Sequence, residues 1–357
     1  MNASYNLGGG MVLPALARPR AARPASGSAL IVALWIISLL SLVICAFAFD
    51  MHLQSRITSY YRKRAKAEFL ARSGIEKATF LLVKSQDVKR NPTEEDETAA
   101  WYGDAKRLSE GLNVVDSVEH LGPGEFKLSI VPEPALRNIN KLTEADWERM
   151  LEVGGVPEEQ RDSLIECFFD WIDPDNDTRS FGAESEDYYK TLDPPYRARN
   201  APLDTVNELL LIKGFTTEIL DGGVPPGAPE GTPAMSGIAN MLTTIGDGKV
   251  NVNAASERVL MTLPGVDEVT AQAIIVEREG DPEQVDQGDT SYHGVADFCA
   301  RFPALKKDLE NLIITDSQVY RITSVANVQG VTWGIAAIAS FANGQLTILR
   351  WEEQANP

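Results

Sequence analysis

The chain has 357 residues, of which 44% are hydrophobic, and a formal net charge of -18 at pH 7. This length leaves room for two or three compact units with real hydrophobic cores, which excludes a mostly disordered chain. The negative charge repels nucleic acid and anionic lipid, so a protein or a cation is the expected kind of partner. Three cysteines are too few for a disulfide scaffold, and no HExxH, CxxC or nucleophile-elbow motif is present. We therefore predict that the protein is not an enzyme.

A continuous apolar stretch occupies residues 28–49 and contains no charged residue, glycine or proline. At about 1.5 Å per residue, an α-helix of this length crosses a hydrocarbon core of about 30 Å. The chain after it stays rich in helix-forming residues and has no glycine or proline before Gly74. We therefore predict one N-terminal helix over residues 28–85, of which 28–49 are transmembrane. The second half of such a helix must be covered by protein.

Residues 1–27 contain three arginines, three prolines and no acid, which is typical of a short unstructured leader. The boundary allows three interpretations: a secretory signal peptide cut after Ala48, an uncleaved signal anchor, or a prepilin-type leader cut between Gly27 and Ser28. Charge alone does not orient the helix, because the flank that follows it is also basic. The basic residues of that flank are Arg56, Arg62, Lys63, Arg64 and Lys66.

Small residues recur at helical spacing in the second half of this helix, at Ala67, Ala71, Gly74 and Ala78. Such a series lets another element approach the helix closely. We interpret it as the face that packs against a sheet rather than as a dedicated subunit interface.

Two groups of strands are predicted, far apart in the sequence. Residues 114–121 and 125–131 flank a Gly-Pro-Gly hairpin signal, and residues 318–328, 331–341 and 346–351 alternate in polarity between turn signals. Each group alone is too small to cover a long helix, so we predict that they form one antiparallel sheet. The expected fold class is α+β, with the long N-terminal helix packed on this sheet.

The predicted sheet implies a domain made of residues 86–134 and 316–357, with residues 135–315 inserted into it. A polar cap, an amphipathic helix and a Gly-apolar turn recur in the insertion after Asn140, Asn200 and Asn253. We therefore predict a large all-α insertion domain that contains helix-hairpin-helix-like units.

The third unit is the most similar to a nucleic-acid-binding helix-hairpin-helix module. In such modules the backbone amides of the turn hold a phosphate, but here the turn continues with Asp267 and Glu268. These carboxylates oppose an anion, so we interpret the unit as a fold element that binds no nucleic acid.

An acidic loop, residues 170–189, lies between the first two units. Its carboxylates occupy positions 1, 3, 5 and 12 of an EF-hand-like loop, although Pro174 and Thr178 depart from that pattern. Calcium prefers such oxygen ligands, so we predict a calcium site; the alternative is a solvated acidic loop. The predicted ligands are Asp173, Asp175, Asp177 and Glu184, with Glu186 and Asp187 as further candidates.

From about residue 27 to residue 351, the chain resembles the minor pseudopilin K family of the type II (general) secretion pathway. The resemblance rests on the Gly27/Ser28 boundary before the apolar helix and on a set of short motifs. These motifs are Asn138-Ile139-Asn140, Phe169-Asp170-Trp171-Ile172-Asp173-Pro174-Asp175, Tyr188-Tyr189, Pro195-Tyr196-Arg197, Asn200-Ala201-Pro202, Asn207-Glu208-Leu209, Asn251-Val252-Asn253-Ala254 and Tyr320-Arg321-Ile322.

The resemblance implies a pilin-like fold for the α/β domain and a single-pass protein of the bacterial inner membrane, with the bulk of the chain in the periplasm. It implies cleavage by the prepilin peptidase after Gly27, methylation of the new N-terminus, and bound calcium. It also implies a structural role with the other minor pseudopilins, at the tip of a short pseudopilus that helps to export folded proteins across the outer membrane.

Val32 is the fifth residue after the predicted cleavage position. In most pilin-like helices this residue is a glutamate, whose carboxylate offsets the N-terminal ammonium of an adjoining subunit in the lipid, where an unpaired charge costs several kcal/mol. A subunit that never stacks beneath another has no such ammonium to neutralise. Val32 therefore marks a tip position.

The competing function is that of a membrane-anchored periplasmic nucleic-acid-binding protein built on the helix-hairpin-helix units. The acidic turn and the net charge argue against it, and a salt-dependent DNA shift would argue for it.

Overall fold

The computed structural model describes residues 27–91, 97–229, 231–280 and 289–355. The predicted leader up to residue 26 lies outside the described residues. The chain divides into two compact units, Met1–Tyr61 and Arg62–Pro357.

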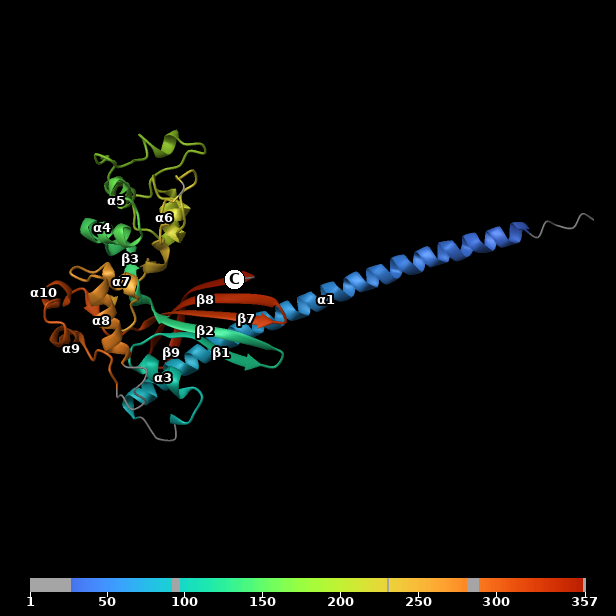
Figure 1. Cartoon of the computed structure of the whole chain (residues 1–357), viewed down its shortest axis with the longest axis horizontal. Coiled ribbons are helices and arrows are strands. Elements are labelled where there is room, and N and C mark those ends of the chain that lie inside the picture. Colours follow the sequence, from blue (N-terminus) through green and yellow to red (C-terminus); the bar gives the residue numbers. More distant parts are fainter. Residues whose placement is uncertain (1–26, 92–96, 230, 281–288, 356–357) are drawn as a thin grey trace, which may run out of the picture. The chain divides into compact units, whose positions relative to one another are not determined.

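Helix α1, Gly27–Arg90, contributes its first half to the first unit (Figure 1). Every side chain from Ser28 to Arg62 is exposed. Among the described residues, α1 is the one helix long and apolar enough to cross a membrane. It ends five residues beyond the expected boundary at residue 85, because one more turn places Val88 in the core beneath the sheet.

Within the described part of the second unit, five strands form one antiparallel sheet in the order β1-β2-β7-β8-β9 (Figure 1). Residues from the two distant strand groups pair directly, as Phe126 does with Ala326, so the prediction of a single sheet is confirmed. The bounds are β1 Val114–Leu121, β2 Gly124–Pro132, β7 Val319–Val328, β8 Val331–Ala342 and β9 Gln345–Ala355.

The second half of α1 packs on this sheet through its small residues. Ala67, Ala71 and Ala78 are fully buried, and alternate residues of β7 are buried beneath them. A Cβ atom at Gly74 would lie 2.1 Å from the Oγ of Ser324 on β7, so the sheet approaches the helix closely there. The helix α3, Tyr102–Ser109, adds Ala105 and Leu108 to the same core.

The insertion has its own core, in which Trp147 packs against Phe168 and Phe215. Its α-helices are α4 Glu144–Val153, α5 Glu158–Ile172, α6 Thr217–Asp221, α7 Glu257–Met261, α8 Glu268–Glu279, α9 Val295–Arg301 and α10 Lys306–Leu309. Its 3-10 helices are η2 Ile139–Lys141, η3 Tyr189–Thr191, η4 Val206–Leu211 and η5 Ala239–Met241, and η1, Glu133–Ala135, lies at the boundary before it.

The insertion also contains strands, so the expectation of an all-α insertion needs correction. The pairs are β3 Arg137–Asn138 with β4 Leu242–Thr243, and β5 Val250–Asn251 with β6 Ile313–Ile314, both parallel. After each first strand an asparagine side chain turns the backbone, since Asn138 accepts the N–H of Asn140 and Asn251 accepts that of Asn253. Strands of two residues are too short to show a period-two pattern in the sequence.

Candidate metal centre

The acidic loop begins where helix α5 ends. Asp173 is the C-terminal cap of α5, and its backbone is already extended. Asp175 Oδ1 accepts the N–H of Asp177 at 3.0 Å, which tightens the loop. The side-chain amide of Asn200 donates to the backbone carbonyl of Asp175 at 2.6 Å. The backbone N–H of Asn200 donates to the backbone carbonyl of Trp171 at 2.9 Å. The start of the loop is thus tied to both the helix end and the returning chain.

Three predicted ligands converge in the folded chain. One carboxylate oxygen from each of Asp173, Asp175 and Glu184 lies within 4.8 Å of the others. Glu184 is 1% exposed, and its Oε2 accepts the N–H of Ser185 at 3.2 Å. The Oε1 of Glu184 and the Oδ1 of Asp173 are buried without a hydrogen-bond partner among the described residues. Buried polar atoms are normally hydrogen-bonded, and these two oxygen atoms have no such partner among the described residues.

The electrostatics of the cluster are unfavourable without a cation. Burial, together with the smaller effect of the charges of Asp170, Asp173 and Asp175, raises the pKa of Glu184 to about 7. Burial also raises the pKa of Asp173, and the charge of Asp175 adds to that effect. A positive ion among these oxygens would reverse both effects.

The other three predicted ligands have different contacts. Glu186 is exposed and forms an ion pair with Lys190. Asp187 accepts the N–H of Glu184 at 2.9 Å through Oδ1, and the hydroxyl of Thr178 at 3.1 Å through Oδ2. Asp177 donates its backbone N–H to Asp175 Oδ1. Asp187 therefore shapes the loop around Glu184, and these three carboxylates lie outside the close cluster.

Two residues that support the loop were not assigned a site role from the sequence. Asp170 is fully buried on α5, and Asn200 has a left-handed backbone with φ 50° and a buried Oδ1 without a partner among the described residues. The sequence does contain a signal for Asp170, because it is an acidic residue between Phe169 and Trp171 in an amphipathic helix. An acidic residue is rarely buried unless it has a specific partner.

The donor set fits calcium. Calcium–oxygen distances are about 2.3–2.6 Å, so two ligands on opposite sides of the ion are at most about 5 Å apart. The 4.8 Å limit of the cluster matches this spacing. The three ligand atoms are all oxygen, whereas zinc prefers nitrogen or sulfur.

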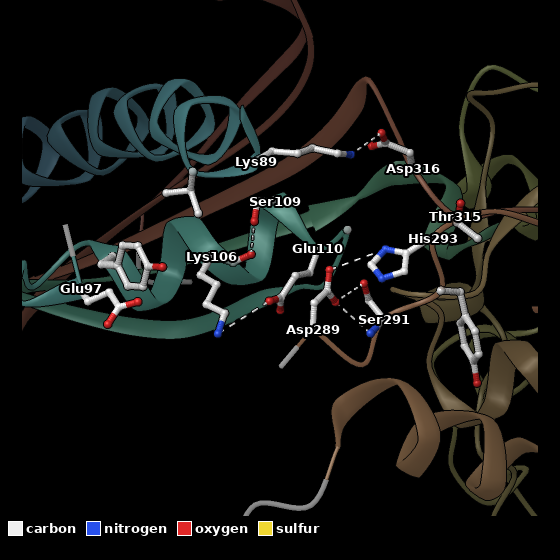
Figure 2. A pocket seen from close by; sticks show the side chains of 14 residues that line it. Lys89, Glu97, Lys106, Ser109, Glu110, Asp289, Ser291, His293, Thr315 and Asp316 are labelled. Atoms are coloured by element: carbon white, nitrogen blue, oxygen red, sulfur yellow. Dashed lines mark hydrogen bonds and ion pairs between the residues drawn. The ribbon is translucent and has the colours of Figure 1, made fainter. Parts of the chain in front are cut away.

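A separate pocket of about 700 Å³ lies where α3 meets the insertion, and its lining is rich in carboxylates. Figure 2 shows Lys106 directed toward Glu110, at 4.0 Å, and Lys89 toward Asp316, at 3.2 Å. Burial and, to a smaller extent, the charge of Asp289 raise the pKa of Glu110 to about 6.

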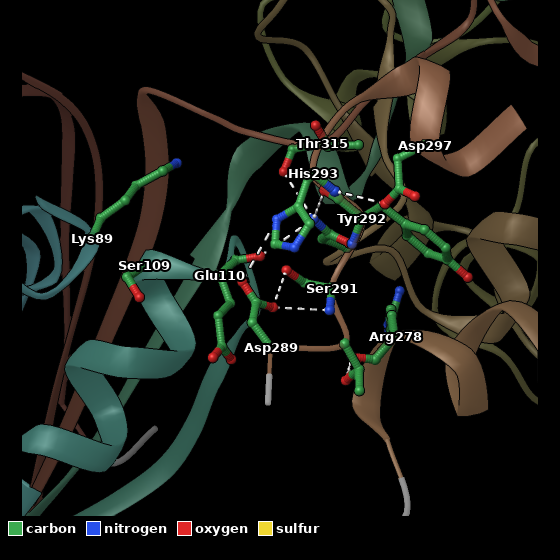
Figure 3. Close-up of polar contacts among 12 residues, drawn as sticks. Lys89, Ser109, Glu110, Arg278, Asp289, Ser291, Tyr292, His293, Asp297 and Thr315 are labelled. Carbon is green, nitrogen blue, oxygen red and sulfur yellow. Dashed lines mark hydrogen bonds and ion pairs between the residues drawn. The ribbon is translucent and has the colours of Figure 1, made fainter. Parts of the chain in front are cut away.

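The insertion side of this pocket is arranged around Asp289 (Figure 3). Its Oδ1 accepts the N–H and the hydroxyl of Ser291, and His293 Nδ1 lies 3.6 Å from its Oδ2. The Asp289 carboxylate is thus held in place while it faces the pocket.

The third helix-hairpin-helix-like unit presents an acid where a phosphate would bind. Asp267 caps α8 by accepting the N–H of Thr270 at 2.8 Å, and Glu268 follows it. Among the described residues, nothing at this turn favours nucleic acid.

The predicted processing site and tip marker lie on α1. The helix begins at Gly27, and Val32 is 56% exposed. Cys45, Cys167 and Cys299 are free cysteines in the described chain, the last two buried.

A long N-terminal helix packed on an antiparallel sheet, with a helical domain inserted before the last three strands, defines a pilin-like fold. Residues 128–222 match the family model described as type II secretion system protein K. The chain is 27% identical over 219 residues to the "Putative type II secretion system protein K" of Escherichia coli K12, covering 59% of this chain and 66% of that relative. Both matches support a relationship of this chain to the protein K family of minor pseudopilins of type II secretion.

A solved structure shows the same fold. It is described as the GspK-GspI-GspJ complex of the type 2 secretion system of enterotoxigenic Escherichia coli, and the matched chain aligns with a TM-score of 0.57 at 15% identity. The alignment covers 85% of this chain and all of that one. At this identity the likeness supports the fold alone.

Proposed function

We propose that the chain caps the tip of a short pseudopilus, assembles there with the other minor pseudopilins, and so takes part in the export of folded proteins across the outer membrane. The observation that carries the tip position is Val32, an uncharged residue where an internal subunit needs a carboxylate. The GspK-GspI-GspJ complex supports the choice of partners. The role is structural rather than catalytic.

The proposal also includes the processing and the membrane topology of the chain. The prepilin peptidase would cut between Gly27 and Ser28 and methylate the new N-terminus, leaving α1 as a single-pass anchor in the bacterial inner membrane and the second unit in the periplasm. The apolar span that starts at Ser28 supports this topology. N-terminal sequencing of the membrane-extracted chain checks it, since a start at Phe49 or at Met1 would contradict it.

A charge at position 32 tests the tip assignment. Val32→Glu buries a carboxylate that has no ammonium partner at the tip, so the variant should be recovered less often with the I-type and J-type minor pseudopilins, and secretion should fall. The measurements are co-isolation from membranes and the amount of exported protein in the medium. Val32→Leu, which keeps the residue apolar, should behave as the wild type. Unchanged recovery and secretion for Val32→Glu would contradict the tip position.

We further propose that the cluster of Asp173, Asp175 and Glu184 binds calcium. The two buried oxygens without partners and the raised pKa of Glu184 support this assignment. Calcium would supply the positive charge that offsets the repulsion among the carboxylates and would hold the loop against α5.

Thermal unfolding with calcium and with chelator tests this site. At a calcium concentration a hundredfold above Kd, binding stabilises the fold by about 2.7 kcal/mol, so the two melts should differ by several degrees. Asp175→Ala should shrink the difference, whereas Glu186→Gln, at an exposed residue paired with Lys190, should retain it. If the wild type melts identically with calcium and with chelator and gives no heat signal on calcium titration, the loop is a solvated acidic loop that binds no calcium.

A further inference from the structure

The segment that carries Glu184 is held by carboxylates of helix α5. Asp170 Oδ2 accepts the backbone N–H of Arg179 at 3.2 Å and that of Ala183 at 2.9 Å. One helical turn earlier, Glu166 accepts the N–H of Phe181. Two side chains of one rigid helix therefore hold three backbone N–H groups of the loop.

The fit between Asp170 and the loop is close. Asp170 is 0% exposed, and a Cβ atom at Gly182 would lie 1.9 Å from its Oδ2. Only a glycine allows the backbone to pass so near the carboxylate. The loop path is therefore built around this side chain.

The bond to Ala183 determines where Glu184 lies, because the two residues are adjacent. Asp170 also lies one turn before Asp173, which begins the loop. Asp170 itself does not belong to the close cluster of three ligand oxygens in the described chain. Its contact with the site thus runs through the backbone of Ala183.

We propose that Asp170 is a positioning residue of the calcium site, which holds Glu184 in place for the ion before the ion binds. This inference rests on the proposed calcium binding. Side chains that orient metal ligands typically change metal affinity by about 10- to 100-fold when they are removed. An asparagine at position 170 keeps an oxygen that can accept both N–H groups, whereas an alanine keeps none.

Calcium titration calorimetry on the full chain in detergent tests the proposal, with calcium chloride as the probe. Asp170→Ala should weaken Kd by about 10- to 100-fold, and Asp170→Asn should weaken it by less than about tenfold. Asp162→Asn makes the same charge change at an exposed residue of α5 and should leave Kd unchanged. Hydrogen exchange of the Arg179 and Ala183 amides, measured with chelator, should accelerate in Asp170→Ala and stay slow in Asp170→Asn.

The outcomes separate the possible roles. Wild-type Kd in both Asp170 variants would overturn the positioning role while leaving calcium binding intact. An equal loss in both variants, with slow amide exchange retained in Asp170→Asn, would make the charge of Asp170 the cause and also overturn positioning. If Asp170→Ala fails to fold, the Asn variant and its exchange rates still decide between these roles. A wild type that binds no calcium would reject the proposed metal and the positioning role together.

Discussion

Glu110 shows how burial and like charge act on a single side chain at the contact between α3 and the insertion. It is the C-terminal cap of α3, its side chain is 13% exposed, and it faces the pocket that also contains Asp289. Its pKa is raised from 4.5 to about 6, chiefly by burial; the charges of Asp289 and Glu279 contribute to the rise, and those of Lys106 and Arg107 oppose it. The folded chain therefore holds this proton more tightly than the unfolded chain does.

The sign of the pH dependence follows from this shift. Protonation of Glu110 stabilises the fold by about 2 kcal/mol. This stabilisation is complete below pH 4.5 and is lost as the pH rises through about 6. Glu110→Gln should therefore raise the melting temperature at pH 7.5 by a few degrees and have little effect at pH 4.5. Thermal melts at both pH values check this, with the exposed Glu152→Gln as the control. An equal effect of Glu110→Gln at both pH values would contradict it.

At the scale of an element, the contact between α1 and the sheet depends on small residues. Ala67, Ala71 and Ala78 are fully buried, and the backbone of Gly74 lies against Ser324 and Phe126. The helix could not approach the sheet so closely with larger side chains at these positions.

A single added methyl group tests this contact. Gly74→Ala places a Cβ 2.1 Å from Ser324 Oγ, so it should destabilise the fold by about 1–3 kcal/mol despite the better helix propensity of alanine. Gly103→Ala on α3, where nothing lies within 4 Å, should be neutral or slightly stabilising. Thermal unfolding of both variants gives the comparison. Equal midpoints for the two would show that the helix and the sheet do not pack as closely as described.

At the scale of the whole second unit, the Asn253 side chain bonds the insertion to the pilin-like domain through the carbonyl of Glu110. Asn253 is 1% exposed, and its Nδ2 donates to the carbonyls of Glu110, Tyr292 and Thr315 at 3.0–3.3 Å. Its Oδ1 accepts the N–H of Tyr292 at 3.0 Å. Asn140 makes the matching bonds in the first unit of the insertion, donating to and accepting from the backbone of Leu203.

Removal of the Asn253 side chain should loosen this connection. Asn253→Ala leaves the buried N–H of Tyr292 and the neighbouring carbonyls unpaired, which should cost about 2–4 kcal/mol of stability. Proteolytic cleavage near residue 111 or residue 315 should also become faster. Asn311→Ala, at an exposed position, should stay within about 0.5 kcal/mol of the wild type. A wild-type melt for Asn253→Ala would show that these four hydrogen bonds do not stabilise the connection.

Local patterns in the sequence were sufficient to predict most of the fold. The uncharged span after Gly27, the small residues from Ala67 to Ala78 and the alternation in residues 319–328 each reflect a periodicity within one element. The spacing of Asp173, Asp175 and Glu184 likewise follows from a short loop, in which residues close in sequence must lie close in space. The two-residue parallel strands were missed because they carry no such period.

The sequence by itself determined the elements of this protein, the single sheet and the carboxylates of the loop, because each depends on periodicity, spacing or the need to cover one helix. Only the tertiary structure decided that three of the six predicted ligands converge, that Asp170 holds the loop through backbone N–H groups, and that Asn253 joins the insertion to the domain that contains it by its bond to Glu110. The contacts of Asp170 and Asn253 are made to backbone atoms. Backbone atoms are identical at every position, so no pattern of side chains records them.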